Sequence, residues 1–320
     1  MTVAGVVDAL LEAPVVTSFT NIGYGVRRRL GHWQGLDAYD LTGQVIVVTG
    51  ATSGLGRAAA EHVARCGATV VVVGRQSARN QVVVDEIAAS TKNAAISQIA
   101  ADLGEPDEVR ALAATLLADH DRLDVLVHNA GALARKRTES SSGIESTVAS
   151  QVVGPFLLTT LLVDRLAAGE TGRVITMSSG GMYAAPLSVS QLQMTAEKYN
   201  GTEQYARAKR AQVTLNEMWA ERYPAANIRF HAMHPGWADT PGVDASLPTF
   251  SKIMGPFLRT PAQGVDTLVW LAADDEALST NGCFWLDRRQ RSLHKVFTTR
   301  RSDTPARRER LWDWVAEVAR

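Results

Sequence analysis

Cysteine is scarce in this sequence, and its scarcity excludes a small protein held together by cross-links. Only Cys66 and Cys283 occur in 320 residues, too few for a disulfide framework. The seven histidines are scattered, with no HxxxH or CxxC spacing of the kind that holds a metal ion. The sequence therefore predicts a protein of a reducing compartment without a structural metal.

An excess of charge of one sign is also absent. Lys and Arg number 33, Asp and Glu number 33, and the formal net charge is zero, so we expect no nucleic-acid partner and no membrane partner. No uninterrupted apolar run approaches the length of a transmembrane helix. The first residues include Asp8 and Glu12 rather than the basic stretch of a signal peptide. We expect a cytoplasmic protein.

What the sequence does contain is an alternation of strand-like and helix-like stretches. β-Branched runs typical of strands lie at 44–49, 68–73, 123–128, 173–178 and 228–234, with weaker ones at 96–101 and 283–286. Helical patterns lie at 55–66, 79–89, 106–118, 144–166, 203–222 and 262–272. This alternation favours βαβ units with helices on both faces of the sheet. We predict one α/β domain with a single Rossmann-type, doubly wound parallel sheet of about seven strands.

Two extensions flank this predicted domain, which spans residues 42–287. The first, 1–41, contains three arginines at 27–29, followed by Leu30 and Trp33. Such a run either contacts an anionic surface or forms a solvated helix face, and we favour the solvated face because the run is short. The second, 288–320, begins a helix at Thr304-Pro305, and we expect that helix to dock on the body or on a neighbour.

A glycine-rich turn, TGATSGLG at 49–56, joins the first predicted strand to an alanine-rich helix. In that position backbone N–H groups can approach a pyrophosphate at the N-terminus of the helix. Glycines also serve ordinary turns, so a glycine triplet alone is weak evidence. The strand–turn–helix context and the TGxxxGxG spacing together favour a dinucleotide site.

A tyrosine and a lysine four residues apart, in YARAK at 205–209, fall on one face of a predicted helix. An ammonium group within roughly 4 Å interacts with a phenolate at about 4 kcal/mol at an effective dielectric constant of about 20. That interaction can lower a tyrosine pKa from near 10 by up to roughly three. Tyr205 is thus a candidate acid/base and Lys209 a candidate for tuning it.

The motifs together resemble the short-chain dehydrogenase/reductase (SDR) family over about residues 42–287. TGATSGLG, HNAG at 128–131, Ser178-Ser179, YARAK and HPGWADT at 234–240 stand in the family's order. SSGGM at 178–182, HPGWADTPGV at 234–243 and AQGVDTLVWLA at 262–272 are similar to the branch named dehydrogenase/reductase SDR family member 12. The resemblance implies an oxidoreductase that interconverts a carbonyl (ketone or aldehyde) and an alcohol with a nicotinamide cofactor.

The resemblance also implies which residues bind the cofactor. They are Thr49, Gly50, Thr52, Ser53, Gly54, Leu55, Gly56, Arg75, Asp102, Leu103, Asn129, Ala130, Gly131, Tyr205, Lys209, Pro235, Gly236 and Thr240. In the family pattern, the Asn at position 129 ties the fourth strand to its neighbour. Asp102 contacts adenine or, as the alternative, caps the helix that begins near Pro106.

The preference between NADP(H) and NAD(H) depends on the residues just after the second strand. In dinucleotide folds an acid there binds the ribose 2′-OH, whereas an arginine accommodates a 2′-phosphate. Here the strand ends in VVVV, Gly74-Arg75 come next, and no carboxylate stands at that position. Arg75 can present a planar guanidinium to a phosphate, although it equally suits an ordinary surface position. We predict NADP(H), with NAD(H) as the alternative.

Hydride transfer to a carbonyl makes an alkoxide, so the site needs an acid and an oxyanion stabiliser. The resemblance assigns Tyr205 as the general acid/base and Lys209 as the residue that lowers its pKa and holds the nicotinamide ribose. It assigns Ser179 as the stabiliser of the substrate oxygen, with Ser178 as the alternative.

Two positions depart from the family pattern. Gln151 stands where the family has its catalytic Asn, on the helix after the fourth strand. A glutamine can still form hydrogen bonds, and we expect a slower or altered proton relay. His128 replaces a more usual Asn, and we expect a packed structural histidine.

The substrate walls are expected in two segments, 181–204 and 237–257. Their apolar residues indicate a small hydrophobic carbonyl or alcohol substrate, unless half of them only pack the loops: Met182, Leu192, Met194, Trp237, Phe250 and Met254. A rival hypothesis is a dinucleotide-binding regulatory or scaffold protein with weak or no catalysis. The resemblance also implies association through the helices at 144–166 and 203–222, so we expect a homodimer or homotetramer.

Overall fold

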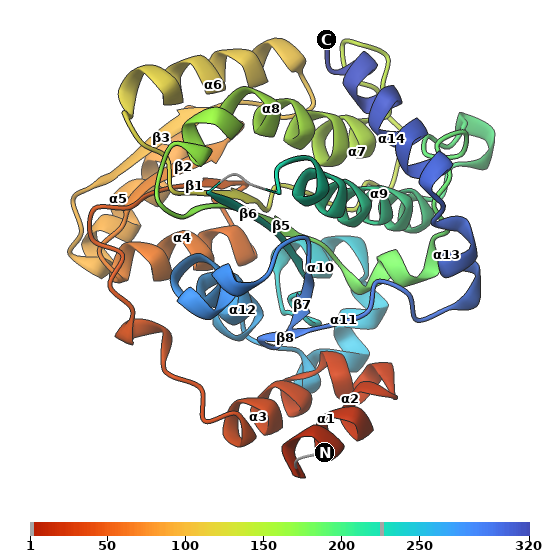
Figure 1. The fold of residues 1–320 in the computed structure, drawn as a ribbon, viewed down its shortest axis with the longest axis horizontal. Coiled ribbons are helices and arrows are strands. Elements are labelled where there is room, and N and C mark those ends of the chain that lie inside the picture. Colours follow the sequence, from red (N-terminus) through yellow and green to blue (C-terminus); the bar gives the residue numbers. More distant parts are fainter. Residues whose placement is uncertain (1–2, 225–226) are drawn as a thin grey trace.

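The computed structural model describes residues 3–224 and 227–320, which form a central sheet between two layers of helices (Figure 1). Within these residues the sheet has eight strands in the order β3-β2-β1-β4-β5-β6-β7-β8. The strands are β1 (Val45–Thr49), β2 (Thr69–Gly74), β3 (Ile96–Ala100), β4 (Val125–His128), β5 (Gly172–Met177), β6 (Ile228–Met233), β7 (Phe284–Leu286) and β8 (Arg289–Gln290). Each neighbouring pair is parallel except β7 and β8.

The central strands are buried along their whole length because helices cover both faces of the sheet. Every residue of β1, β4 and β5 is buried, which is the pattern of a parallel sheet covered on both sides. The predicted doubly wound sheet of about seven strands is confirmed. The short β8 was not predicted, because it has only two residues and both are polar.

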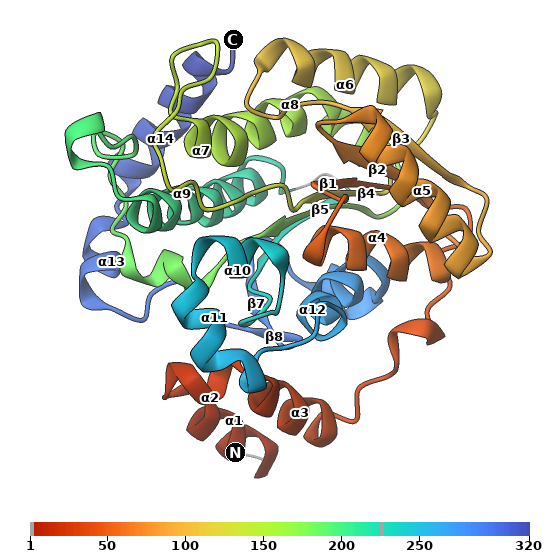
Figure 2. The same ribbon diagram turned by 180° about the vertical axis from the view of Figure 1, so that it is seen from behind.

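The long helices divide between the two faces (Figures 1 and 2). One face carries α4 (Gly54–Arg65), α5 (Ser77–Thr91) and α12 (Pro261–Ala273), and the other carries α6 (Pro106–Asp119), α8 (Gly154–Ala167) and α9 (Gly201–Arg222). The strand order reverses between β1 and β4. A crevice therefore forms at the carboxyl ends of these strands, where ligands bind in open α/β sheets.

Short helices occupy the connections. They are η1 (Leu36–Ala38), η3 (Gly180–Ala184), η4 (Ala196–Lys198), α10 (Pro241–Ser246), α11 (Pro248–Met254), η5 (Gly255–Phe257), η6 (Asp275–Ser279) and α13 (Phe297–Ser302). Helices α10 and α11 lie in the segment 237–257 that was predicted to wall the substrate site.

The helix predicted at 144–166 contains a π-helical turn. Helix α7 (Ser146–Val148) continues into η2 (Ala149–Val153), where the N–H of Gly154 donates to the carbonyl oxygen of Ala149, five residues earlier. Pro155 comes next and has no N–H to donate to the previous turn, which favours this widened turn. The departure from the family pattern, Gln151, lies within it.

The same helical stretch bears on the expectation about membranes. Over Ser146–Ala167 it is long and apolar enough to cross a membrane, but 78% of its most apolar window is buried inside the protein. It packs against α6 on one side and contacts the C-terminal helix. Its apolar character is accounted for by its place in the core.

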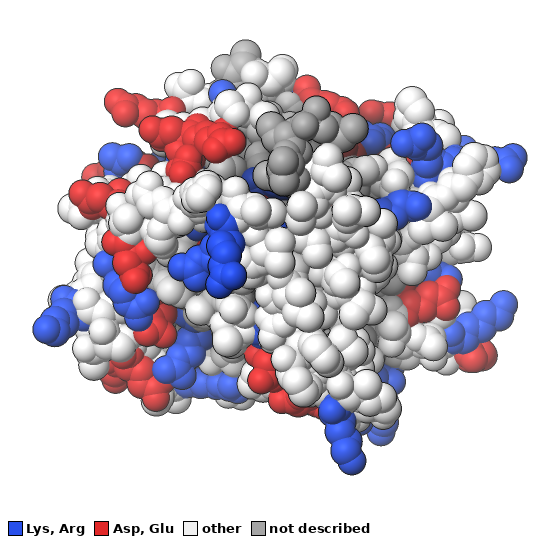
Figure 3. Space-filling model, turned by 90° about the horizontal axis from the view of Figure 1, so that it is seen from below, with Lys and Arg blue, Asp and Glu red and all other residues white. Residues whose placement is uncertain are grey.

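The N-terminal extension folds into α1 (Val3–Glu12), α2 (Val15–Phe19) and α3 (Asn21–Leu30), at the lower edge in Figure 1. The expectation of a solvated face for the three arginines is wrong for Arg27, which is 3% exposed. Its guanidinium donates to Asp8 and to Asp287, at 2.7 Å each. Seen from below in Figure 3, charges of both signs surround a broad uncharged area.

Asp287 is the centre of this buried ion network. It lies between Arg27 and Arg259, and each of the three side chains is 1% exposed. Burial alone would raise the pKa of Asp287, but the two guanidinium groups hold it below its usual range. Arg259 also donates to the carbonyl oxygen of Pro235. The network thus connects the N-terminal helices to the loop after β6.

The C-terminal helix α14 (Pro305–Val318) docks on the body, one of the two predicted outcomes. Thr304 caps it by accepting from the N–H of Arg307, and Leu311 is fully buried. Trp312 packs edge-on against the aromatic rings of α8 and α9. These are the helices through which association was predicted. The homodimer or homotetramer stays a prediction. In such an assembly a partner would contact α8 and α9 beside the docked α14.

Replacing Arg27 by methionine should destabilise the fold, because Asp8 and Asp287 would each lose a cation. Removing one partner of a buried ion pair costs about 3–5 kcal/mol, so the urea midpoint of Arg27→Met should fall at neutral pH. Because the pKa of folded Asp287 is depressed, this stabilisation is present above the unfolded pKa of about 3.9 and is lost as the pH falls through the folded value. Arg28→Met, at an exposed neighbour, is the control, and equal midpoints for the two variants would contradict the network.

Candidate active site

The glycine-rich stretch between β1 and α4 lets the backbone approach a ligand because its glycines lack side chains. Gly50 and Gly54 have φ angles of +65° and +52°, in the left-handed region that favours glycine. A Cβ at Gly56 would lie 2.3 Å from both Asn129 Nδ2 and the carbonyl oxygen of Gly50. Helix α4 begins within this stretch, at Gly54, and its N-terminus favours a negatively charged group.

Hydrogen bonds from Asn129 connect the end of β4 to this loop. Its Nδ2 donates to the carbonyl oxygens of Thr49 and Gly50, at 2.9 and 3.2 Å. The hydroxyl of Thr49 accepts from the N–H groups of Asn129 and Ala130 and donates to the carbonyl oxygen of Val127. The two strand ends at the reversal of strand order are thereby held in one geometry.

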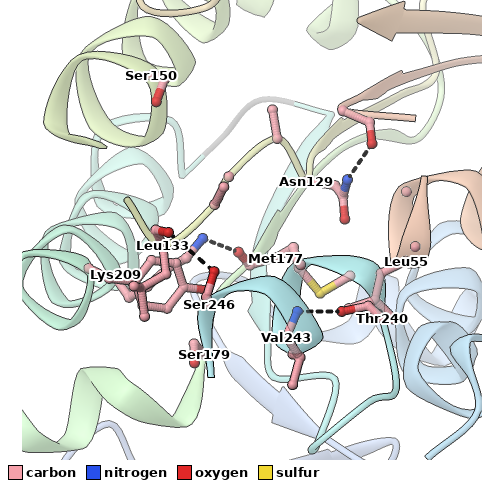
Figure 4. A pocket seen from close by; sticks show the side chains of 18 of the residues that line it. Leu55, Asn129, Leu133, Ser150, Met177, Ser179, Lys209, Thr240, Val243 and Ser246 are labelled. Atoms are coloured by element: carbon pink, nitrogen blue, oxygen red, sulfur yellow. Dashed lines mark hydrogen bonds between the residues drawn. The ribbon is translucent and has the colours of Figure 1, made fainter. Parts of the chain in front are cut away.

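A cavity of about 850 Å³ opens at these strand ends (Figure 4). The predicted cofactor residues that line it are Gly50, Thr52, Ser53, Gly54, Leu55, Gly56, Arg75, Asp102, Leu103, Asn129, Ala130, Gly131, Tyr205, Lys209, Pro235, Gly236 and Thr240. Thr49 does not line it, because its side chain is fully buried and bonded to the end of β4. The volume is in the range of about 300–1,000 Å³ that is usual for small-molecule sites.

Arg75 and Asp102 mark the outer rim of the cavity. The side chain of Arg75 is 78% exposed, and its guanidinium lies 4.0 Å from Asp102. Asp102 accepts from the N–H of Gly104, so its carboxylate also shapes the turn after β3. Arg75 thus combines a largely exposed side chain with a place in the lining of the cavity.

The three predicted catalytic side chains converge on one wall of the cavity. Ser179 follows β5, and Tyr205 and Lys209 lie one turn apart on α9. The ammonium of Lys209 donates to the carbonyl oxygen of Met177 at 2.9 Å (Figure 4). Its Nζ lies 5.3 Å from the centre of the Tyr205 ring. Ser178 lines the cavity too, but among the described residues its buried hydroxyl has no hydrogen-bond partner, whereas the hydroxyl of Ser179 forms a hydrogen bond with Tyr205.

Burial dominates the protonation of the Tyr–Lys pair in the described residues. It raises the pKa of Tyr205 to about 12, against a lowering by the hydrogen bond with Ser179. It lowers the pKa of Lys209 to about 7. A lysine of this kind carries only part of its charge near neutral pH. The lowering of the Tyr205 pKa by Lys209 that the sequence predicts stays a prediction.

Gln151 lies behind the cavity wall rather than in it. Its side chain is 1% exposed and packs against Gly131, where a Cβ would lie 2.9 Å from the amide group. Its Nε2 donates to the carbonyl oxygen of Ala132 at 2.9 Å, and its Oε1 has no hydrogen-bond partner in the part of the chain that the structure describes. Gln151 therefore supports the backbone that lines the cavity, and no described contact joins it to Lys209.

Most of the predicted substrate residues are corrected by the structure. Met182, Leu192 and Met194 are buried and do not line the cavity, although Gly181, Ala184 and Thr202 of the same segment do. Arg210, on α9, holds that segment by donating to the carbonyl oxygen of Met182. Trp237 does line the cavity, as does Phe250 on α11. Met254, outside the lining, is the fourth correction.

Sequence reasoning missed two parts of the site. The segment after β4 supplies lining residues such as Leu133 and Ser140, and its position after a strand end was the signal that could have located it. Arg259 was also missed. Its guanidinium lies behind Gly236, where a Cβ would be 2.2 Å from Arg259 Nε.

Within the described residues no group of three His, Cys, Asp or Glu side chains is placed to hold a metal ion.

The sheet, the glycine-rich loop and the Ser–Tyr–Lys cluster define an α/β oxidoreductase of the Rossmann class. The model of the family described as short chain dehydrogenase matches residues 44–249. The chain belongs to the short-chain dehydrogenase/reductase family.

Relatives of known sequence or structure agree with this assignment. Dehydrogenase/reductase SDR family member 12 of Homo sapiens is 39% identical over 280 residues, 87% of each chain, which confirms the resemblance to that branch. Retinol dehydrogenase 12 of Bos taurus is 30% identical over 280 residues, again 87% of each. A short chain dehydrogenase from Escherichia coli, crystallised with NADPH, has a TM-score of 0.65 and 25% identity, and the match covers 80% of this chain and all of that one.

Replacing Gly56 by alanine should destabilise the protein, because the new methyl group would overlap Asn129 and the backbone of Gly50. Overpacking of this kind costs about 1–3 kcal/mol and should lower the urea midpoint. Gly25→Ala is the matched control, since Gly25 lies in α3 and no atom of the described residues is within 4 Å of its Cβ position. It should be neutral or stabilise by about 0.5–1 kcal/mol. Two midpoints that move in the same direction would contradict the close packing at Gly56.

Proposed function

We propose that this protein is an NADP(H)-dependent oxidoreductase that interconverts a carbonyl, in a ketone or aldehyde, and an alcohol. The observation that carries the proposal is the convergence of Ser179, Tyr205 and Lys209 on a cavity whose opposite wall is a glycine-rich loop. An acid, an oxyanion stabiliser and a phosphate-binding loop are what hydride transfer to a carbonyl needs.

The residues of the cavity fit a nicotinamide dinucleotide. Gly50 and Gly56 leave a backbone cradle that a Cβ would fill, which suits a pyrophosphate beside the N-terminus of α4. Arg75, exposed at the rim, would pair with a 2′-phosphate, which favours NADP(H) over NAD(H). The complex of the Escherichia coli relative with NADPH supports this choice. When bound, the cofactor supplies or accepts the hydride.

The chain's own residues hold and move the proton. The hydroxyl of Ser179 donates to the substrate oxygen and stabilises the charge that develops there. Tyr205, with a pKa of about 12, is protonated at neutral pH and can therefore donate its proton to an alkoxide. Lys209, with a pKa of about 7, exchanges a proton near neutrality and can restore the one that Tyr205 gives up.

The substrate we propose is a small hydrophobic carbonyl or alcohol. Trp237, Leu247 and Phe250 line the cavity and come from the segment 237–257. Apolar walls with a few polar groups are typical of sites for such molecules. The retinol dehydrogenase relative, named for a hydrophobic alcohol, supports this choice. We propose a cytoplasmic location on the zero net charge and the burial of the apolar helix.

Tyr205→Phe should abolish turnover and leave NADPH binding intact, because it removes only the hydroxyl that donates the proton. The measurement is NADPH oxidation with a panel of aldehydes, ketones and quinones, beside NADPH binding by fluorescence. Tyr199→Phe is the control, since the Tyr199 hydroxyl contacts Ala134 and Glu145, and Tyr199 itself does not line the cavity. Binding of NADPH without turnover of any substrate by the wild type would favour the regulatory or scaffold function instead.

Arg75→Ala should weaken binding of NADPH much more than binding of NADH. Loss of a charge-assisted hydrogen bond to a phosphate raises the Kd by about tenfold or more, and NADH has no 2′-phosphate to lose. Arg300→Ala, at an exposed position on α13 outside the cavity, is the control for a general change of charge. An equal effect of Arg75→Ala on both cofactors would mean that Arg75 does not determine the preference.

A further inference from the structure

Helix α9 carries a row of polar side chains that continues beyond the catalytic pair. Tyr205, Lys209, Gln212 and Asn216 are spaced four, three and four residues apart, so they lie along one face of the helix. The first two line the large cavity, whereas Gln212 and Asn216 lie deeper, at 5% and 4% exposure. Polar side chains at such depth require partners.

A second, small cavity lies against this deeper part of α9. Its volume is about 30 Å³, and its polar lining comes from the following residues: Gln212 and Asn216 on α9, Gln151 on the π-helical turn, His128 at the end of β4, Thr159 on α8 and Thr176 on β5. Within the described residues, neither end of the Gln212 amide has a hydrogen-bond partner, nor do Gln151 Oε1, Asn216 Oδ1 and His128 Nδ1. Exchanging the positions of the amide nitrogen and oxygen of Gln212 does not give either atom a hydrogen-bond partner, because both positions are unpaired.

The size and chemistry of this cavity match water. One buried water needs roughly 10–15 Å³ of such space and two to four polar partners, so the cavity has room for about two. Burial lowers the pKa of His128 to about 3, so its ring is neutral and offers one donor or acceptor at Nδ1. An empty cavity would instead leave several polar atoms unpaired, which is destabilising.

We propose that this cavity is a built water site, in which one or two buried waters bridge Gln151 on η2 to Gln212 and Asn216 on α9. The bridge has a definite place in the molecule. On its other side Gln151 donates to Ala132 and packs against Gly131, in the backbone that walls the large cavity. The waters therefore fix the distance between that wall and the helix that carries Tyr205 and Lys209. Gln212 and Asn216 act as positioning residues, a role that rests on the proposed function.

The direction of a stability change tests whether the water is there. Gln212→Met keeps the size of the side chain and removes its polar atoms. If waters occupy the cavity, the methionine cannot form hydrogen bonds with them, and the water bridge to Gln151 is lost. The urea midpoint of the variant should then fall. If the cavity is dry, the variant removes two unpaired polar atoms, and its midpoint should stay equal or rise, which would overturn the proposal.

The matched control is Thr214→Val, a similar loss of polarity on the same buried helix. The hydroxyl of Thr214 donates to the carbonyl oxygen of Arg210 within α9 and does not line the small cavity. The Gln212→Met midpoint should lie below that of Thr214→Val. A crystal structure should show water density between Gln151 and Gln212, and an empty cavity there would also overturn the proposal.

A binding measurement tests the positioning role separately. Gln212→Met should raise the Kd for NADPH about threefold to tenfold, while Thr214→Val leaves it unchanged. A Kd unchanged by Gln212→Met would remove the link between the water site and the cavity wall. If the wild type itself fails to bind NADPH, the proposed function fails, but the unfolding comparison still decides whether the water site exists.

Discussion

The hydrogen bonds between Thr49 and Asn129 are the constraint on which the site depends. They join the ends of β1 and β4, the two strands between which the strand order reverses. The junction consists of backbone and short side chains. The glycine-rich loop therefore packs directly against Asn129 on one side, and its other side lines the cavity. The cavity, the start of α4 and the wall at Gly131 all take their positions from this junction.

Burial, rather than pairing of charges, sets the chemistry of the catalytic helix. It brings Lys209 to a pKa of about 7 and Tyr205 to about 12, so the phenol is protonated and the amine exchanges protons at neutral pH. By contrast, Asp287 stays charged at full burial because two guanidinium groups face it. The support of the loop after β6 thus holds a buried carboxylate in its charged form through the two guanidinium groups that pair with it.

The sequence predicted the parts of the fold and site that depend on local patterns. Continuous apolar runs located the strands, and the glycine spacing located the phosphate loop, because both patterns are set by backbone geometry. The substrate residues were predicted less well. Met182, Leu192 and Met194 are apolar for packing rather than for binding, and an apolar residue looks the same in sequence in either role. Arg27 was misread for a similar reason, because its acidic partners are distant in sequence.

The sequence by itself determined the fold class, the phosphate loop and the spacing of Tyr205 and Lys209, since each depends on neighbours a few residues away. Only the tertiary structure decided what depends on distant segments. It placed Gln151 behind the wall at Gly131 instead of beside Lys209, and it seated α14 on α8 and α9. It also showed that burial raises the pKa of Tyr205. Burial is a property of the whole packed molecule, and no local pattern reports it.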